Sequence, residues 1–269
     1  MHRDVMSSEP RITQPSRFVL ELRLLLMAVQ YFTRVPMPAS VGHSQEQLSG
    51  TARYFTAVGL LVGGVGALVL WASSLVLPGP LPAILSTAAT AFLTGAFHED
   101  GLADTFDGLG GATTRERALE IMKDSRLGTF GTLALVLTLL IKIAALDALP
   151  TEFAVVVLLA GHAFSRACAI SLLYVSNHVG NPEQSRARAV AQPMSGAQFL
   201  IAAVFGVVPL ALCGVHAVAG FFGAVFVLYV LARWFLRRLG GFTGDTLGAA
   251  QQLTEIAFYL AVLASWNSF

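Results

Sequence analysis

Apolar and polar positions follow each other along this chain in long blocks. Apolar runs of about 20 residues, the length a helix needs to cross a membrane, recur through the sequence with polar segments between them. They predict seven transmembrane helices, at residues 54–77, 81–97, 130–149, 153–175, 197–214, 216–236 and 246–266. We therefore expect an all-α fold, a polytopic integral membrane helical bundle.

A shorter apolar run, Phe18–Thr33, differs from the others because it contains Glu21 and Arg23. Charges within such a run are more typical of a helix that lies in the membrane interface than of a span. We expect residues 1–53 to form a cytoplasmic N-terminal segment with an interfacial helix, and residues 54–269 to form the transmembrane domain.

The distribution of positive charge predicts the orientation of the bundle. With a cytoplasmic N-terminus, segments 1–53, 98–129, 176–196 and 233–245 face the cytoplasm and contain 15 of the 17 Lys and Arg residues. The remaining two, Lys142 and Arg166, lie within predicted spans, and the outer loops contain none. This asymmetry follows the positive-inside rule, so the long polar segments are expected on the cytoplasmic side.

Composition agrees with a membrane protein. Hydrophobic residues make up 55% of the chain and charged residues only 12%, whereas soluble domains contain about 25% charged residues. The net charge of +1 argues against a nucleic-acid-binding protein, which would show a basic face. Cys168 and Cys213 lie in apolar runs without paired spacing, so we interpret them as small hydrophobic residues.

The segment HEDGLADTFDGLGG, residues 98–111, contains four carboxylates and no Lys or Arg. If it continues as a helix from the preceding run, Asp100, Asp104 and Asp107 share one face, with Glu99 about a quarter-turn away. Uncompensated carboxylates repel one another unless a cation lies between them. The pattern favours a hard divalent cation, Mg²⁺ or Mn²⁺; the alternative is a solvated acidic helix end.

The segment MKDSRLGTFG, residues 122–131, places cations, hydroxyls and glycines at the start of the next span. Lys123 and Arg126 are the cations, and Ser125 and Thr129 supply the hydroxyls. Such a combination at a helix start is suited to phosphate; the alternative is that the two cations serve only as interfacial anchors. Beside a metal site, it indicates phosphoryl transfer on a pyrophosphate.

Charged residues inside the predicted spans need a partner or a function. Arg166 and His162 lie one turn apart, so Arg166 either reaches an anionic substrate from within the bundle or pairs with a structural carboxylate. Lys142 and Asp147 lie near an outer helix end, and we expect them to extend toward the outer interface.

Three further polar positions have two interpretations each. Asp245, among glycines before the last span, either caps that helix or adds a carboxylate to the cytoplasmic site. Arg34, in FTRVP, faces either substrate phosphate or lipid phosphate. The 176–196 loop contacts substrate or lipid headgroups through polar residues, namely His178, Asn181, Arg186 and Arg188.

Four motifs together resemble a known family. YFTRVP (31–36), EDGLADTFDG (99–108), MKDSRLGTFG (122–131) and GGFTGDTLGAAQQ (240–252), in this order among these spans, resemble the cobalamin synthases, which are adenosylcobinamide-GDP ribazoletransferases of the bacterial inner membrane. The resemblance covers essentially the whole chain. It implies a Mg²⁺-dependent transfer of phosphocobinamide from adenosylcobinamide-GDP to α-ribazole, or to α-ribazole 5′-phosphate, with release of GMP.

Carried over residue by residue, the resemblance places four groups of residues in the motifs. Glu99, Asp100, Asp104 and Asp107 occupy the acidic motif; Lys123, Asp124, Ser125 and Arg126 occupy the next; and Thr243 and Asp245 stand in the last. The resemblance implies no separate role for each residue.

Our mechanistic hypothesis divides the roles within the transmembrane catalytic domain, residues 54–269. A Mg²⁺ held by Asp100, Asp104 and Glu99 bridges the donor pyrophosphate. Asp107 is the candidate general base, partly by analogy with membrane CDP-alcohol phosphotransferases. Lys123 and Arg126 are the catalytic cations that stabilise the phosphoryl oxygens. Five further residues are expected to bind substrate: Arg34, Ser125, Thr129, Arg166 and Asp245.

Two rival functions remain. A CDP-alcohol-type phosphotransferase would carry an Arg shortly after its Asp-Gly pair, whereas here Leu-Ala-Asp follows Asp100-Gly101. A cation transporter would place its carboxylates near the membrane midplane, whereas these lie at the cytoplasmic end of a predicted span. The expected partners are the two substrates and membrane lipid, without nucleic acid, and the sequence is compatible with a homo-oligomer.

Overall fold

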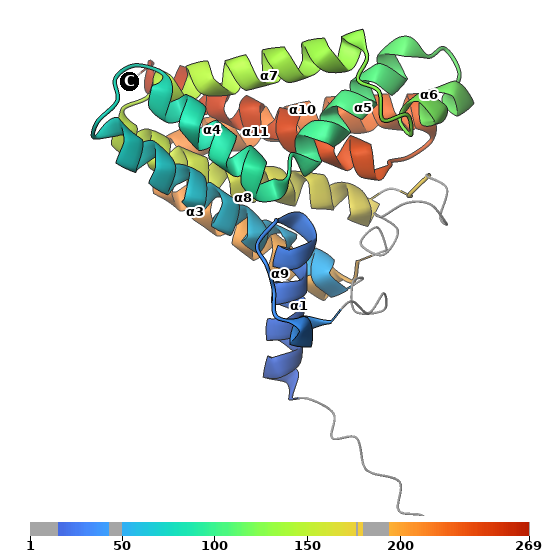
Figure 1. Cartoon of the computed structure of the whole chain (residues 1–269), viewed down its shortest axis with the longest axis horizontal. Coiled ribbons are helices and arrows are strands. Elements are labelled where there is room, and N and C mark those ends of the chain that lie inside the picture. Colours follow the sequence, from blue (N-terminus) through green and yellow to red (C-terminus); the bar gives the residue numbers. More distant parts are fainter. Residues whose placement is uncertain (1–15, 43–49, 176, 180–193, 269) are drawn as a thin grey trace, which may run out of the picture.

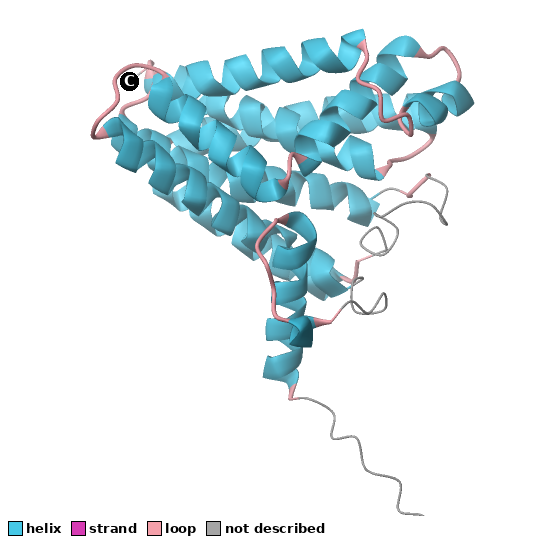
Figure 2. Cartoon of the chain, in the orientation of Figure 1, coloured by secondary structure: helices cyan, strands magenta, loops and turns pink. Residues whose placement is uncertain are grey.

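The computed structural model describes residues 16–42, 50–175, 177–179 and 194–268. Within these ranges the chain consists of helices joined by short loops, and no β-strand is formed (Figures 1 and 2). The predicted all-α fold is confirmed.

The helices lie close to the predicted apolar runs. The N-terminal part contains α1 (Arg17–Phe32) and the short helices η1 (Ala39–Val41) and η2 (Ala52–Tyr54). The bundle contains α3 (Phe55–Ser74), α4 (Leu81–Thr94), α5 (Phe97–Gly111), α6 (Arg115–Ile121), α7 (Thr129–Asp147), α8 (Thr151–Val175), α9 (Gly196–Val207), η4 (Val208–Cys213), α10 (His216–Leu239) and α11 (Gly244–Trp266).

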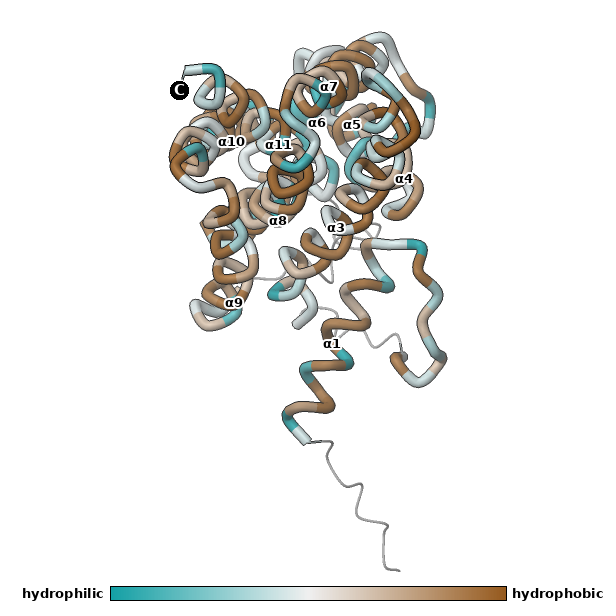
Figure 3. The backbone as a smooth tube through the Cα atoms, turned by 90° about the vertical axis from the view of Figure 1, so that its left-hand side faces the viewer, coloured by the Kyte–Doolittle hydropathy of each residue, from teal (hydrophilic) through white to brown (hydrophobic). Residues whose placement is uncertain are grey.

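The described part of the chain contains six helical segments long and apolar enough to cross a membrane, and α4 with α5 makes a seventh if this bent pair is one span. The predicted polytopic membrane architecture is therefore confirmed. Helix α8 lies in the middle of the bundle, between α3 and α11 (Figure 3). Glycines allow this close packing: a Cβ on Gly63 of α3 would lie 3.0 Å from the Cβ of His162 on α8.

One prediction about the acidic segment is wrong. The acidic residues do not continue the helix of the preceding apolar run, because the chain turns by 89° between α4 and α5. Gly95 and Ala96 both have left-handed backbone angles, with φ of +68° and +57°, and they end α4. With 14 residues, α4 is about 21 Å long, shorter than the ~30 Å hydrocarbon core. The carboxylates thus lie on a separate helix.

The predicted N-terminal helix is present as α1. Its C-terminal half is buried against the bundle through Leu24, Met27 and Phe32, while Phe18 and Leu22 near its start are exposed. Its first turns extend away from the other helices (Figure 3). Its position in the membrane interface stays a prediction, as does the division of the chain at residue 53.

The interior of the bundle contains an ion pair that the sequence did not predict. Lys142 is only 2% exposed, and its Nζ lies 2.6 Å from Oε1 of Glu255 on α11. The prediction that Lys142 extends to the outer interface is therefore wrong, because a buried carboxylate on another helix satisfies it. Asp147, at the end of α7, is exposed. Cys168 and Cys213 are buried and form no disulfide, as predicted.

Candidate active site

The three aspartates of the acidic segment lie along one stripe of α5. Asp100 is exposed, Asp104 is half-buried and Asp107 is buried, so the stripe runs from the surface into the bundle. The carboxylates of Asp100 and Asp107 are close enough to Asp104 to repel its negative charge. The predicted shared face is confirmed, although it belongs to a separate helix.

Helix α11 adds a fourth aspartate to this stripe. Asp245, half-buried in the first turn of α11, also repels Asp104 electrostatically. The two helices touch closely, because a Cβ on Gly101 would lie 2.8 Å from the backbone oxygen of Asp245. Thr243, not Asp245, caps α11, through a reciprocal pair of hydrogen bonds with Thr246. Of the two roles predicted for Asp245, joining the acidic site fits the structure.

The carboxylate of Asp107 is held at the start of α7. One oxygen of its carboxylate accepts the backbone N–H of Gly128 at 2.7 Å, and the other accepts that of Gly131 at 2.8 Å. These groups belong to the first turn of α7, so Asp107 caps that helix. Hydrogen bonds to both oxygens fix the Asp107 carboxylate against the start of α7. The geometry therefore does not support Asp107 as the general base.

Glu99 points to the side of the stripe, as its position in the helix predicted. Its Oε1 accepts a hydrogen bond from Nε2 of Gln252 on α11 at 3.1 Å. Its other oxygen is buried and has no hydrogen-bond partner among the described residues. Glu99 therefore faces α11 and not the surface where Asp100 lies.

The MKDSRLGTFG segment begins at Met122, the residue that follows α6, and forms a loop and the start of α7. The contacts of Gly128 and Gly131 with Asp107 hold this loop beside the acidic helix, so the structure brings the two motifs together as predicted. Lys123, Ser125 and Thr129 are exposed here.

Arg126, one of the two cations of this loop, pairs with a neighbouring aspartate. Arg126 is 87% exposed, and its Nη2 lies 2.5 Å from Oδ2 of Asp124. Hydrogen bonds from Arg126 lower the pKa of the Asp124 carboxyl to about 2. The pair uses Nε and Nη2 of Arg126, and among the described residues no ion pair joins Arg126 to the acidic stripe.

Arg34 lies at the bend between α4 and α5. Its backbone N–H donates to the carbonyl of Leu93 at 2.8 Å, and a Cβ on Gly95 would lie 2.6 Å from Nε of Arg34. The exposed Arg34 side chain is thus packed against the turn that precedes the acidic helix. The structure brings this predicted phosphate-binding residue to the N-terminal side of the site.

Arg166 lies inside the bundle instead of on this surface. It is 1% exposed, and its Nη1 lies 3.2 Å from Nδ1 of His162 and donates to the His162 carbonyl at 2.9 Å. Nδ1 of His162 in turn lies 3.2 Å from Oε2 of Glu255. Arg166 is thus linked to the buried Glu255 carboxylate only through His162, and among the described residues it forms no direct ion pair with a carboxylate. Its contact with substrate stays a prediction.

Glu255 is the centre of this network and was missed by the sequence analysis. Besides Lys142 and His162, its carboxylate accepts hydrogen bonds from Gln251 at 2.6 Å and from Tyr259 at 3.1 Å. A carboxylate in the middle of a predicted span was the available signal, since such a residue is costly in a membrane without partners.

The structure describes only part of the predicted polar loop. Within it, Val179 donates its N–H to the carbonyl of Phe242 at 2.9 Å, and the Phe242 N–H bonds to Asn177, which places His178 beside the start of α11. Burial lowers the pKa of His178. Asn181, Arg186 and Arg188 lie outside the described residues.

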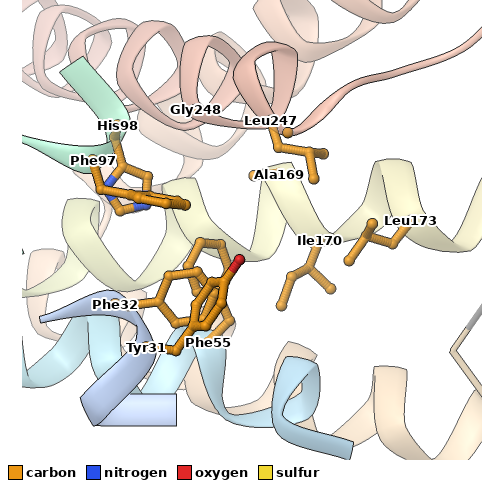
Figure 4. Close-up of a pocket in the computed structure, with 11 residues that line it drawn as sticks. Tyr31, Phe32, Phe55, Phe97, His98, Ala169, Ile170, Leu173, Leu247 and Gly248 are labelled. Atoms are coloured by element: carbon orange, nitrogen blue, oxygen red, sulfur yellow. The ribbon is translucent and has the colours of Figure 1, made fainter. Parts of the chain in front are cut away.

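A pocket lined mainly by apolar groups adjoins the acidic helix. We call it the aromatic pocket; Figure 4 shows its side chains. It is lined by Tyr31, Phe32, Phe55, Phe97, His98, Ala169, Ile170, Leu173, Gly244, Leu247 and Gly248. The sequence analysis did not single it out, because its residues come from five separate parts of the chain.

The oxygen atoms of the acidic stripe suit a hard cation, but its side chains lie too far apart to surround one. Among the described residues, no group of three or more His, Cys, Asp or Glu side chains is close enough to hold a metal ion. Asp100, Asp104 and Asp245 supply only oxygen donors, the type that Mg²⁺ prefers, and their mutual repulsion is relieved by a cation. The residues therefore suit Mg²⁺ by charge and donor type, although their carboxylates are not gathered around one point in this structure.

Comparison with known proteins identifies the family. Residues 24–263 match the family described as cobalamin-5-phosphate synthase. An adenosylcobinamide-GDP ribazoletransferase of Leptothrix cholodnii is 48% identical over 254 residues, covering 91% of this chain and 96% of that protein. A protein of the same name from Shewanella amazonensis is 45% identical over 257 residues, covering 94% and 99%. No solved structure matches the chain significantly. The matched range includes all four motifs, and the chain belongs to the cobalamin-5-phosphate synthase family.

Proposed function

We propose that this chain is a membrane enzyme that transfers the phosphocobinamide part of adenosylcobinamide-GDP to α-ribazole, or to α-ribazole 5′-phosphate, and releases GMP. The observation that carries the proposal is the family match over residues 24–263, which includes every motif described above. Relatives that share 45–48% of their residues with it carry the name adenosylcobinamide-GDP ribazoletransferase.

The reaction breaks the P–O bond between the two phosphates of the donor and forms a new P–O bond to a hydroxyl of the acceptor. The hydroxyl loses its proton, and GMP leaves with the bridging oxygen. Negative charge therefore builds up on the leaving group and on the transferred phosphoryl group, and the site has to supply positive charge.

We propose Mg²⁺ as the main source of this charge, held by Asp100, Asp104 and Asp245. When bound, it would neutralise the pyrophosphate and the leaving GMP. Asp245 replaces Glu99 in the predicted ligand set, because Glu99 is turned toward Gln252 while Asp245 lies beside Asp104.

The basic residues around the acidic stripe are the proposed phosphate contacts. Arg34 lies on one side, at the bend before α5. On the other side lies the loop of Lys123 and Arg126, with the hydroxyls of Ser125 and Thr129. A pyrophosphate between them would meet cations at both ends, which orients the donor relative to the carboxylates.

We further propose that the protein lies in the bacterial inner membrane with this site facing the cytoplasm. The charge asymmetry supports this orientation, since 15 of the 17 Lys and Arg residues lie in segments on the same predicted side as the acidic helix.

The direct test is GMP release by the purified, full-length protein. It is incubated with adenosylcobinamide-GDP, α-ribazole and Mg²⁺, and GMP is measured by chromatography. We expect GMP formation that depends on both substrates and stops with EDTA. Asp104→Asn should reduce kcat at least 100-fold, the scale of a lost catalytic group, while the protein stays folded. Asp147→Asn, on the exposed end of α7, is the matched control and should keep full activity. Full activity of Asp104→Asn would exclude the metal assignment.

A further inference from the structure

The aromatic pocket has a composition that distinguishes it from ordinary helix packing. Aromatic rings of α1, α3 and α5 meet there: the ring centroids of Phe32 and Phe55 are 4.1 Å apart, and that of His98 lies 5.7 Å from Phe55. The His98 and Phe32 rings are nearly parallel, at an angle of 19°. Figure 4 shows these rings on one side and Ile170 and Leu247 on another. The pocket therefore offers flat aromatic and aliphatic walls.

One polar atom in this apolar setting has no partner. Nε2 of His98 is buried and forms no hydrogen bond with any described residue. A buried ring nitrogen without a partner costs free energy, and His98 is itself only 2% exposed. This nitrogen belongs to a residue that lines the pocket, and a bound ligand can supply the missing hydrogen bond. The hydroxyl of Tyr31 is a second polar group of the lining.

The pocket shares its helix ends with the acidic site. His98 lies two residues before Asp100 on α5, and Gly244, which lines the pocket, directly precedes Asp245 on α11. A ligand that fills the pocket therefore has its outer end beside the carboxylates.

We propose that the aromatic pocket binds the 5,6-dimethylbenzimidazole base of the α-ribazole acceptor, an inference that rests on the proposed function. This base is flat and mostly apolar, and in the nucleoside its one unsubstituted ring nitrogen is a hydrogen-bond acceptor. The N–H of His98 at Nε2 would donate to that nitrogen. The ribose would then extend from the pocket toward the aspartates, where its hydroxyl reacts.

The other parts of the two substrates fit the pocket less well. Guanine presents several donors and acceptors, and a pocket with almost entirely apolar walls would leave them unpaired, at a cost for each. The corrin macrocycle is far too large for a pocket enclosed by these eleven residues. The adenine of the adenosyl group of the donor also presents several donors and acceptors, so the base of the acceptor is the aromatic group that suits these apolar walls best.

The first experiment measures binding without turnover. Free 5,6-dimethylbenzimidazole is titrated into the purified wild-type protein by calorimetry, with adenine as the comparison. We expect saturable binding of the benzimidazole and much weaker binding of adenine. His98→Phe keeps a flat ring but removes the nitrogen, and it should weaken binding about tenfold. Equal binding of the two bases, or no binding of the benzimidazole, would overturn the proposal.

The second experiment distinguishes an effect on binding of the acceptor from an effect on binding of the donor during turnover. Leu247→Trp enlarges a side chain that points into the pocket, whereas Leu260→Trp makes the same change at an exposed position of α11. We expect Leu247→Trp to raise KM for α-ribazole at least tenfold with little change in KM for adenosylcobinamide-GDP, and Leu260→Trp to change neither. An equal rise in both constants would contradict the assignment.

The two experiments distinguish failure of the pocket from failure of the proposed function. Benzimidazole binding that depends on His98, in a protein that releases no GMP, supports the pocket and overturns the proposed reaction. Normal GMP release together with absent benzimidazole binding overturns the pocket and leaves the reaction intact.

Discussion

The carboxylate of Asp107 on α5 accepts a hydrogen bond from the backbone N–H of Gly131 on α7 at 2.8 Å. Its second oxygen bonds to Gly128, and a Cβ on Gly128 would lie 2.5 Å from the Asp107 carboxylate. Only glycine leaves room for this contact. The pair fixes the MKDSRLGTFG loop against the acidic helix, so the aspartate nearest to this loop acts as a structural anchor.

Replacing Asp107 should therefore affect stability more than chemistry. Asp107→Asn keeps one acceptor oxygen but turns a donor toward the other N–H, and we expect it to lower the free energy of unfolding by about 1–2 kcal/mol. At a temperature where the variant is folded, kcat should fall less than tenfold. Thermal unfolding in detergent and GMP release measure the two effects. A general base would instead lose 10²- to 10⁴-fold in kcat with unchanged stability.

Arg126 should contribute to binding of the donor substrate and not to stability of the fold. Arg126→Ala removes one proposed phosphate contact, and we expect KM for adenosylcobinamide-GDP to rise about tenfold while KM for α-ribazole stays constant. Arg117→Ala is the control, since Arg117 is exposed on α6 and paired with Glu120 at 2.7 Å. If the two variants have the same donor KM, Arg126 has no role in binding.

The pairing of Arg126 with Asp124 also predicts that this pair does not change the KM for the donor between pH 5 and 9. The pKa of Asp124 is lowered to about 2, below the ordinary value of about 3.9. A carboxyl with a lowered pKa contributes above its unfolded value and loses that contribution only as the pH falls toward 2. Between pH 5 and 9 the pair is therefore unchanged, and Asp124→Asn should leave the shape of the donor-KM profile over this range unaltered. A step that appears in wild type and vanishes in this variant would contradict the assignment.

Close packing between α5 and α11 should be required to align the aspartates. Gly101→Ala adds a Cβ 2.8 Å from the Asp245 backbone oxygen and must push the two helices apart. We expect kcat to fall at least tenfold, because small displacements of catalytic groups have large effects on rate. Gly64→Ala on α3 is the control, since its nearest neighbour would be 4.0 Å away. Equal kcat values for the two variants would show that the α5–α11 contact does not determine the alignment of the aspartates.

Much of the fold was predictable because the membrane imposes it. Apolar runs of spanning length and the excess of Lys and Arg on one side are strong one-dimensional signals. The stripe of Asp100, Asp104 and Asp107 was predictable for a similar reason, since spacings of four and three residues define one helix face.

The rest depends on contacts that sequence periodicity does not encode. Gly95 is a local signal for the left-handed turn that ends α4, but one glycine within an apolar run does not predict the 89° bend between α4 and α5. The capping role of Asp107 depends on two glycines more than twenty residues later. Arg166 pairs within its own helix, and whether it faces substrate or the interior is decided only by packing.

The buried pair of Lys142 and Glu255 should be a major contributor to stability. Lys142→Met leaves the Glu255 carboxylate buried beside His162 without its closest cation, and the loss of one partner of such a pair costs about 3–5 kcal/mol. Glu255→Gln likewise leaves the Lys142 ammonium buried without its carboxylate. In the double variant neither charge is left alone, so we expect it to be more stable than Lys142→Met, as a double-mutant cycle from thermal unfolding would show. Asp147→Asn, on the same helix but exposed, should have no effect. If the double variant loses the sum of the two single losses, the residues act independently and the 2.6 Å contact does not couple α7 to α11.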